Sequence, residues 1–165
     1  MVRWISLVCA LAFLIWPGAA PVAQAASDGP VLLTVKINGD EARTVTFTRT
    51  DLAALGETSF ETETIWTSGV QTFTGVSLQT LAEHLGLKDG VLEARAINDY
   101  MVEVPLADAI EGGPIIAYLR NGQEMSVREK GPLWLVYPYD SNPAYKTEAV
   151  YSRSIWQLER IDVEQ

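Results

Sequence analysis

The feature that most constrains the fold is an apolar run at residues 133–137, in which no position is charged. A half-exposed strand alternates apolar and polar residues, so a continuous run predicts a strand buried on both faces. Gly131-Pro132 precedes the run and Pro138 follows it, and each marks a sharp change of chain direction. The rest of the chain must therefore supply enough structure to cover both faces of this strand.

A polar loop at residues 139–143 follows the apolar run, and it is bracketed by Tyr137 and Tyr145. A central strand that delivers two tyrosines and a carboxylate to a loop would suit a flat polar ligand. The alternative is a core strand followed by an ordinary turn, because exposed loops collect polar residues in any case. This stretch alone leaves both interpretations open.

The first residues have the pattern of a secretory signal peptide. Arg3 gives a positive start, residues 4–16 form an apolar core, and Ala23-Gln24-Ala25 matches the small-residue cleavage rule. The apolar core is too short for a membrane span, which needs roughly 20 residues. We therefore expect residues 1–25 to be cleaved, with an uncleaved anchor as the alternative. Residues 26–165 would then form a single exported domain that does not insert in the membrane.

The cysteine content and the charge exclude several kinds of site. Cys9 is the only cysteine and lies within the predicted signal peptide. The mature chain would therefore have no disulfide, no thiolate metal ligand and no cysteine nucleophile. The net charge is −9, and an acidic domain is a poor candidate for binding nucleic acid or anionic lipid, because both need basic patches.

Hydrophobic periodicity and turn residues predict more strands than helices. We expect a helix from Asp51 to Gly56 with Thr50 as its N-cap, a helix capped by Ser77 and ended by Gly86, and a helical turn at residues 106–110. Because strands and helices do not alternate regularly, the pattern predicts an α+β domain with a mixed or antiparallel sheet and a few short helices. Hairpin turns are expected at residues 38–40 and 121–122, and strands at residues 31–37, 44–47, 58–67, 70–74, 91–97, 100–104, 115–119 and 155–163.

Few familiar catalytic arrangements find support. His84 is the only histidine and lies beside the apolar face of a predicted helix, so zinc, redox metals and a nucleophilic triad all lack the residues they require. Gly112-Gly113 lacks the strand–turn–helix context and the lysine of a phosphate-binding loop. Paired carboxylates for sugar hydrolysis stay open, because 21 acidic residues make chance pairs easy.

What remains is a set of aromatic residues near turns and strand ends, flanked by carboxylates and arginines. Aromatic faces stack on planar heterocycles, carboxylates accept paired N–H donors, and arginine donates to carbonyls. Trp134 and Trp156 lie inside predicted strands, so we interpret them as core residues. The remaining candidates are Trp66, Phe73, Tyr100, Tyr137, Tyr139, Tyr145 and Tyr151 among the aromatics, and Asp99, Arg120, Arg128, Asp140, Arg153 and Ser154 among the polar residues.

Five motifs, in order, resemble the sulfite-oxidase-like molybdopterin-binding fold. Together they extend over roughly residues 33–163. Residues 73–81 resemble the family's W-x-G-V-x-L-x-x-L-L segment, and residues 96–109 its D-G-Y strand and L-x-D-A turn. The other three are residues 116–123, which resemble L-A-Y-x-x-N-G-E, residues 131–138, which resemble G-x-P-L-R-L-V-V-P, and residues 154–158, which resemble S-V-K-W-L.

The departures from this family concern the metal. Catalytic members place a molybdenum-ligating cysteine after the strand that corresponds to residues 61–65, and this chain has Thr64, Ile65, Trp66 and Thr67 there. Hydroxyl and indole groups do not replace a thiolate as a soft ligand. The family's arginine in P-L-R is Trp134 here. The resemblance therefore implies an inherited fold without molybdenum and without catalysis.

This cysteine-less form is similar to small periplasmic proteins described as pterin-binding. That resemblance implies a periplasmic location and a free pterin as ligand. It also implies that the loaded protein contacts the periplasmic part of an inner-membrane signalling enzyme, such as a cyclic-di-GMP cyclase or phosphodiesterase. Two alternatives stay open: a molybdopterin-dependent oxidoreductase that manages without the cysteine, and an accessory or structural protein with a vestigial pocket.

The resemblance also gives each candidate residue an expected role toward a pterin. The site would contain Phe73, Tyr100, Tyr137 and Ser154, with Trp66 and Tyr139 stacking on the ring, Asp99 or Asp140 accepting from the ring N–H and the exocyclic amine, and Arg120, Arg128 or Arg153 meeting the carbonyl or the pterin side chain.

Overall fold

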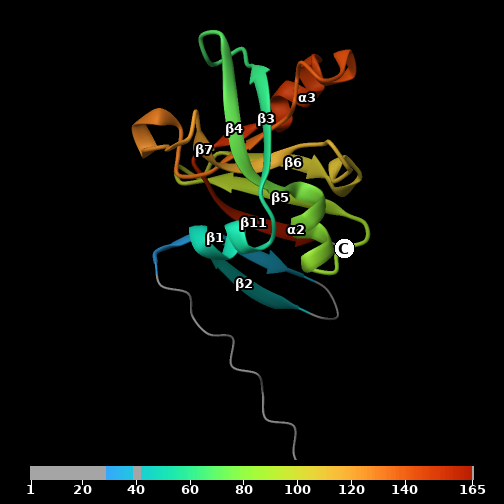
Figure 1. The fold of residues 1–165 in the computed structure, drawn as a ribbon. Coiled ribbons are helices and arrows are strands. Elements are labelled where there is room, and N and C mark those ends of the chain that lie inside the picture. The colour runs from blue at the N-terminus through green and yellow to red at the C-terminus, as the bar shows by residue number, and fades with distance from the viewer. Residues whose placement is uncertain (1–28, 39–41, 165) are drawn as a thin grey trace, which may run out of the picture.

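The computed structural model describes residues 29–38 and 42–164 (Figure 1). The predicted signal peptide and most of the predicted turn at residues 38–40 lie outside this part of the chain. Within it, no helix is long and apolar enough to cross a membrane. The described residues form two β-sheets and a few short helices around one apolar core, so the predicted α+β class is confirmed.

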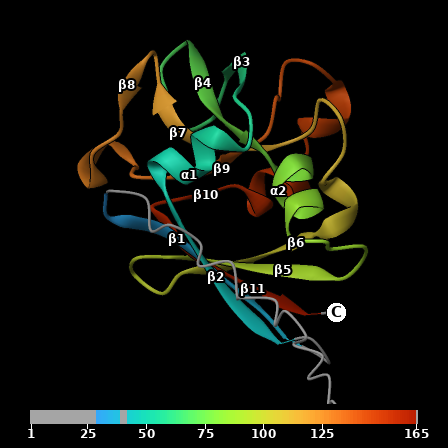
Figure 2. The ribbon, with the colours of Figure 1, turned by 60° about the horizontal axis from the view of Figure 1, so that its bottom comes forward.

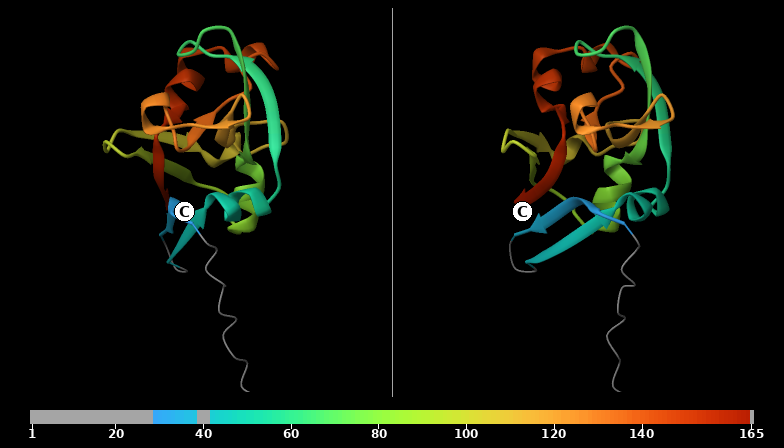
Figure 3. Two further views of the ribbon diagram at one scale, coloured as in Figure 1. Left: turned by 60° about the vertical axis from the view of Figure 1, so that its left-hand side comes forward. Right: turned by 90° about the vertical axis from the view of Figure 1, so that its left-hand side faces the viewer.

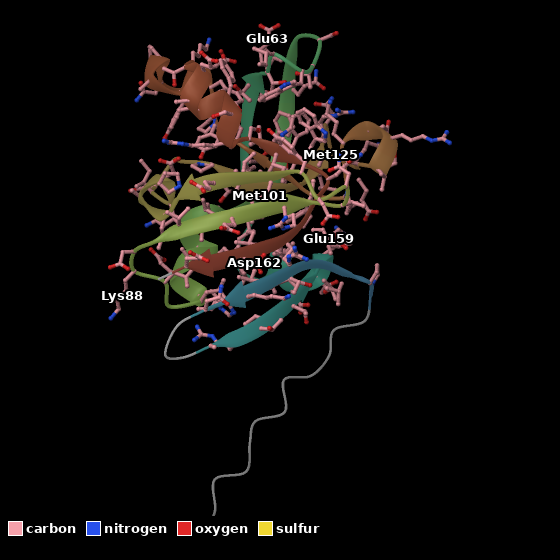
Figure 4. The ribbon with its side chains drawn as sticks, turned by 180° about the vertical axis from the view of Figure 1, so that it is seen from behind. Glu63, Lys88, Met101, Met125, Glu159 and Asp162 are labelled. Carbon is pink, nitrogen blue, oxygen red and sulfur yellow. The ribbon has the colours of Figure 1, made fainter. Side chains whose placement is uncertain are left out.

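The first sheet has five strands in the order β2-β1-β11-β5-β6. β1 and β11 run parallel, with Val35 opposite Ile161, and the other neighbours are antiparallel, so the sheet is mixed. Figure 4 shows these strands from behind, with Met101 labelled on β6 and Asp162 on β11. The bounds are β1 Val31–Ile37, β2 Arg43–Thr48, β5 Val91–Ala96, β6 Met101–Pro105 and β11 Leu158–Glu164.

The second sheet has the order β10-β9-β7-β4-β3, with the short β8 paired to β7, and all its neighbours are antiparallel. β9 is the centre of the apolar run and lies between β7 and β10. Its three residues are fully buried, as the sequence predicts. The bounds are β3 Thr58–Glu63, β4 Val70–Ser77, β7 Ile115–Arg120, β8 Gln123–Glu124, β9 Trp134–Val136 and β10 Ile155–Trp156.

The helices are short, and two of them lie where the sheets meet (Figure 2). α1 follows β2, and α2 follows β4. α2 begins at the predicted cap, because the Ser77 hydroxyl accepts from the Thr80 amide at 2.9 Å. Leu78 and Leu81 of α2 are buried against β1, β5 and β11. The bounds are α1 Arg49–Ala54, α2 Leu78–His84 and α3 Glu148–Arg153, with 3₁₀ turns η1 Leu106–Asp108, η2 Val127–Glu129 and η3 Pro143–Tyr145.

Two predicted boundaries near the N-terminal half are wrong. α1 is capped by Thr48 rather than Thr50: the Thr48 hydroxyl accepts from the Asp51 amide at 3.2 Å, and the Asp51 carboxylate accepts from the Thr48 amide at 2.8 Å. This capping box gives the backbone amides of Thr48 and Asp51 one hydrogen-bond acceptor each at the start of the helix. The strand predicted for residues 58–67 ends at Glu63, because residues 64–69 form the connection to β4.

The predicted strand at residues 155–163 is interrupted, and the helix before it was missed. Gln157 has a φ of 54° and divides the stretch into β10 and β11. The break lets the chain leave the second sheet, where β10 pairs with β9, and enter the first, where β11 pairs with β1 and β5. Ahead of it, residues predicted only to lead into a strand form α3.

Candidate functional site

An open cavity of about 440 Å³ lies where α3, β10, the β5–β6 turn and the β3–β4 turn meet. Figures 1 and 3 show α3 beside the tip of the long β3–β4 hairpin, and Figure 4 shows it above β6. The volume falls within the range of small-molecule sites, about 300–1,000 Å³. The lining residues are Trp66, Ala96, Asn98, Tyr100, Glu148, Tyr151, Ser152, Ser154, Ile155 and Trp156.

The β3–β4 turn positions Trp66, and Thr64 organises that turn. The buried Thr64 hydroxyl accepts from the Trp66 amide at 3.1 Å and lies 2.9 Å from the Thr67 hydroxyl. The Thr67 amide donates to the Thr64 carbonyl at 3.4 Å. Threonine hydroxyls are well suited to such local bonds to the backbone. The turn therefore holds itself together and presents the indole of Trp66 to the cavity.

Trp66 is the centre of an aromatic cluster that forms the apolar wall. Its ring centroid lies 5.5 Å from Trp156, 5.9 Å from Tyr151, 6.2 Å from Trp134 and 6.3 Å from Tyr139, mostly edge to face. Trp156 and Tyr151 share the wall with Trp66, whereas Trp134 and Tyr139 lie behind it and are fully buried. Such packing fixes ring positions, so the wall is a rigid surface suited to a flat ligand.

The polar side chains of the cavity differ in how many of their donors and acceptors already take part in hydrogen bonds within the protein. The Ser154 hydroxyl accepts from the Trp134 indole at 3.1 Å and donates to the Leu135 carbonyl at 2.7 Å, so it is well satisfied. The Asn98 side-chain oxygen accepts from the Tyr100 amide at 3.3 Å, which leaves its NH₂ group to donate. Glu148 is the only charged residue of the wall, and it is exposed at the first turn of α3.

Asp108 anchors α3, which supplies three residues of the wall. Its carboxylate accepts from the Arg153 guanidinium at 2.8 Å and from the Tyr137 hydroxyl at 2.7 Å. Burial and this bond to Asp108 raise the pKa of Tyr137 above its ordinary value. At the other end, the Thr147 hydroxyl accepts from the Val150 amide at 3.3 Å. α3 is thereby fixed relative to both η1 and the end of the apolar run.

The structure brings three of the predicted site residues into the wall, namely Trp66, Tyr100 and Ser154. Tyr139 lies directly behind, with its ring centroid 4.7 Å from that of Tyr151. Asp99 occupies the turn between Asn98 and Tyr100 with a φ of 64°, a conformation that aspartate tolerates better than most residues. Asp99 itself is not a lining residue.

The other predicted residues lie away from the wall. Asp140 fastens its loop to β3 instead: its carboxylate accepts from the Glu63 amide at 2.6 Å and from the Thr62 hydroxyl at 3.2 Å, and it pairs with Lys146 at 2.6 Å. The bond to Lys146, followed by the one to the Glu63 amide, lowers the pKa of Asp140. Of the rest, Phe73 and Tyr137 are core residues, Arg153 is paired with Asp108, Arg120 ends β7, and Arg128 lies in η2.

The lining also contains residues that the sequence interpretation missed or misassigned. Trp156, which the sequence predicts to be a core residue, does pack against the core, but it is only partly buried and also lines the cavity. Asn98, Glu148 and Ser152 were not singled out. A signal for α3 was present, because Thr147 followed by Glu148 has the form of an N-cap with an acid in the first turn.

The cavity residues do not fit a metal-bearing molybdopterin. In the described part of the chain, no group of three or more His, Cys, Asp or Glu side chains is arranged to hold a metal ion. Where catalytic relatives would place the cysteine, Thr64 and Thr67 use their hydroxyls within the turn. Among the residues that the structure describes, no lysine, arginine or histidine lines the cavity to meet a cofactor phosphate.

Comparison with known proteins identifies the family. No curated protein matches the chain. A model of the family described as "Oxidoreductase molybdopterin binding domain" matches residues 24–141, which is more than half of the chain. The match includes Trp66 and the β5–β6 turn of the cavity, and it ends before α3. The chain therefore belongs to the molybdopterin-binding oxidoreductase domain family, which has the sulfite-oxidase-like fold.

Proposed function

We propose that this protein binds a free pterin in the cavity, without molybdenum and without catalysing a redox reaction. Membership of a molybdopterin-binding family supports a pterin-type ligand. The observation that carries the proposal is the rigid aromatic wall around Trp66, bordered by the Asn98 and Ser152 side chains and the Glu148 carboxylate. A planar heterocycle would stack on this wall while its polar edge meets the rim.

The wider role that we propose is sensing outside the cytoplasm. In this proposal the protein is exported to the periplasm, binds a pterin, and relays occupancy to the periplasmic part of an inner-membrane signalling enzyme such as a cyclic-di-GMP cyclase or phosphodiesterase. The signal-peptide pattern of residues 1–25 supports export. Resemblance to cysteine-less periplasmic pterin-binding proteins supports the relay.

Calorimetric titration with reduced and oxidised pterins tests the binding proposal. We expect saturable binding, and we expect Trp66→Ala to weaken it by about 5-fold to 100-fold, because stacking on one aromatic ring contributes about 1–3 kcal/mol. Ile65→Ala is the matched control: Ile65 neighbours Trp66, is 65% exposed and does not line the cavity. Absence of saturable binding below the millimolar range would overturn the proposal.

The second candidate function is molybdenum-dependent oxidoreduction, which the family description favours. Elemental analysis of the protein purified from its native host separates the two. Molybdenum in stoichiometric amount would overturn the non-catalytic proposal, whereas a pterin extracted without molybdenum would support it.

A pull-down of membrane proteins with and without pterin would test the relay. A partner that is captured equally by the wild-type protein and the Trp66→Ala variant would not be responding to bound pterin.

A further inference from the structure

We infer that the cavity selects pterins that carry no phosphate, and that Glu148 is a residue that determines this selectivity. The inference rests on the proposed function and adds the class of pterin to it. Three observations carry it: the charge of the wall, the engagement of the surrounding cations, and the state of the α3 N-terminus.

The wall is electrostatically suited to a neutral or cationic ligand. Among its ten residues, Glu148 is the only one that is charged, and it is negative. The remainder are aromatic, aliphatic, hydroxyl or amide side chains. A phosphate monoester carries close to two negative charges at neutral pH. Such a group would be repelled by Glu148 and would find no cation on the wall to offset the loss of its hydration.

Three cations of neighbouring residues are already held by other groups. The guanidinium of Arg153 pairs with Asp108 at 2.8 Å, and the ammonium of Lys146 pairs with Asp140 at 2.6 Å. The ammonium of Lys130 lies 4.1 Å from the ring centroid of Trp156, a cation–π contact. A phosphate could therefore pair with the Lys130 ammonium only if Lys130 gave up its contact with Trp156.

The α3 N-terminus is not a substitute anion site. The helix is six residues long, the Val150 amide is bonded to the Thr147 hydroxyl at 3.3 Å, and Glu148 places a carboxylate in the first turn. That carboxylate already complements the positive end of the helix dipole.

The test compares one pterin bearing a polyhydroxylated side chain with its phosphate monoester. Each is titrated into the wild-type protein, with quenching of tryptophan fluorescence and calorimetry as readouts, at low ionic strength and again in 0.5 M salt. We expect the ester to bind about tenfold more weakly or worse at low salt, since two negative charges meet the Glu148 carboxylate across a solvated rim. The difference should shrink in high salt.

Variants assign the effect to residues. Glu148→Gln should reduce the discrimination several-fold, and Glu148→Lys should abolish or reverse it. Glu83→Lys makes the same change of charge on the exposed face of α2, outside the cavity. This control should leave the discrimination between the two ligands unchanged. Lys130→Gln should also leave it unchanged, because Lys130 is engaged with Trp156.

The outcomes separate this inference from the proposed function. Equal wild-type affinity for the two ligands would overturn the selectivity while leaving pterin binding intact. Binding of neither ligand would overturn the proposed function, and with it the inference. An equal response to Glu83→Lys and Glu148→Lys would overturn the role of Glu148. Near-UV circular dichroism of each variant shows whether the fold is kept, which is expected because Glu148 is exposed.

Discussion

Tyr139 places a phenol behind the cavity wall in an unusual state. It is fully buried, and its hydroxyl makes no hydrogen bond of normal geometry among the described residues. Burial raises the pKa of Tyr139 to about 12, although Ser154 lies near enough to lower this pKa slightly. Tyr137, two residues earlier, is equally buried, but its hydroxyl donates to Asp108 at 2.7 Å. The two tyrosines are therefore a useful pair, because both are buried and only Tyr137 donates to a carboxylate.

This pair predicts opposite effects of the same substitution. Tyr139→Phe removes a buried hydroxyl that makes no hydrogen bond of normal geometry, so it should leave the free energy of unfolding unchanged or raise it by about 1 kcal/mol. Tyr137→Phe removes a bonded hydroxyl and should lower that free energy by about 1–2 kcal/mol. Urea unfolding of both variants measures the difference. The prediction fails if Tyr139→Phe is the more destabilising of the two.

At the scale of an element, α3 depends on its anchors. Isolated helices of six residues are not stable in water, and α3 is fixed by Thr147 at one end and by Asp108 at the other. Asp108→Ala should therefore lower the free energy of unfolding by about 1–3 kcal/mol, because it leaves Arg153 and the Tyr137 hydroxyl without their acceptor.

Two measurements check the α3 prediction. Chemical denaturation gives the loss of stability, and amide hydrogen exchange should be accelerated in residues 148–153. Glu124→Ala serves as the control, because it removes an ion pair to Arg49 whose two side chains are both largely exposed. Exposed pairs contribute little, so the control should change stability by less than about 1 kcal/mol. Equal losses in the two variants would refute the anchoring role of Asp108.

β4 and β7 approach each other so closely at Gly75 that no side chain fits. A Cβ atom added there would lie 2.0 Å from the carbonyl oxygen of Ile116. Gly75→Ala should therefore cost about 3 kcal/mol or more of unfolding free energy, since backbone must move. Gly122→Ala is the contrasting case: its φ is +74° but nothing lies within 4 Å of the new Cβ. It should cost only about 1–2 kcal/mol, a difference that thermal or urea unfolding resolves.

The sequence predicts elements well where one periodicity acts over the whole segment. β1, α2 and the buried β9 follow directly from apolar pattern, caps and flanking prolines. It predicts poorly where a single residue redirects the chain. The interruption at Gln157 depends on tertiary bonds, because the Ile97 amide donates to its carbonyl at 3.0 Å and its own amide donates to the Lys130 carbonyl at 3.1 Å.

Apart from Trp156, the aromatic part of the site was predictable from the sequence, whereas apart from Ser154 its polar part was not. Trp66 and Tyr100 stand out because large aromatic residues in turns are uncommon away from ligands or interfaces. Glu148 and Ser152 do not stand out, since an acid or a serine near a helix start is ordinary. They join the cavity only because Asp108 holds α3 against the rest of the wall. Such a long-range contact has no local signature in one sequence.

For the molecule as a whole, three buried tyrosines predict alkaline instability. The pKa values of Tyr118 and Tyr139 are raised to about 12 by burial, and that of Tyr137 is raised further. Unfolded tyrosine ionises near pH 10. Above pH 10 the unfolded state therefore releases protons that the folded state retains, and stability falls as pH rises.

The slope of this loss is a testable quantity. Each tyrosine should contribute up to about 1.4 kcal/mol per pH unit between pH 10 and about 12, so that all three together contribute at most roughly 4 kcal/mol per unit. Urea unfolding at fixed ionic strength, with phenolate absorbance as a second readout, measures it. Tyr139→Phe should reduce the slope by about one third. Stability that stays flat from pH 10 to 11.5 would contradict the prediction.

The position of β11 within the first sheet has a consequence for biogenesis. β11 lies between β1 and β5, and it is the last strand of the described chain. The β1–β2 and β5–β6 hairpins therefore cannot join into one sheet until residues 158–164 have been synthesised. The first sheet is therefore incomplete until β11, the strand between the two hairpins, has been synthesised. In the export that we propose, the translocation machinery would meet a chain whose first sheet is still incomplete.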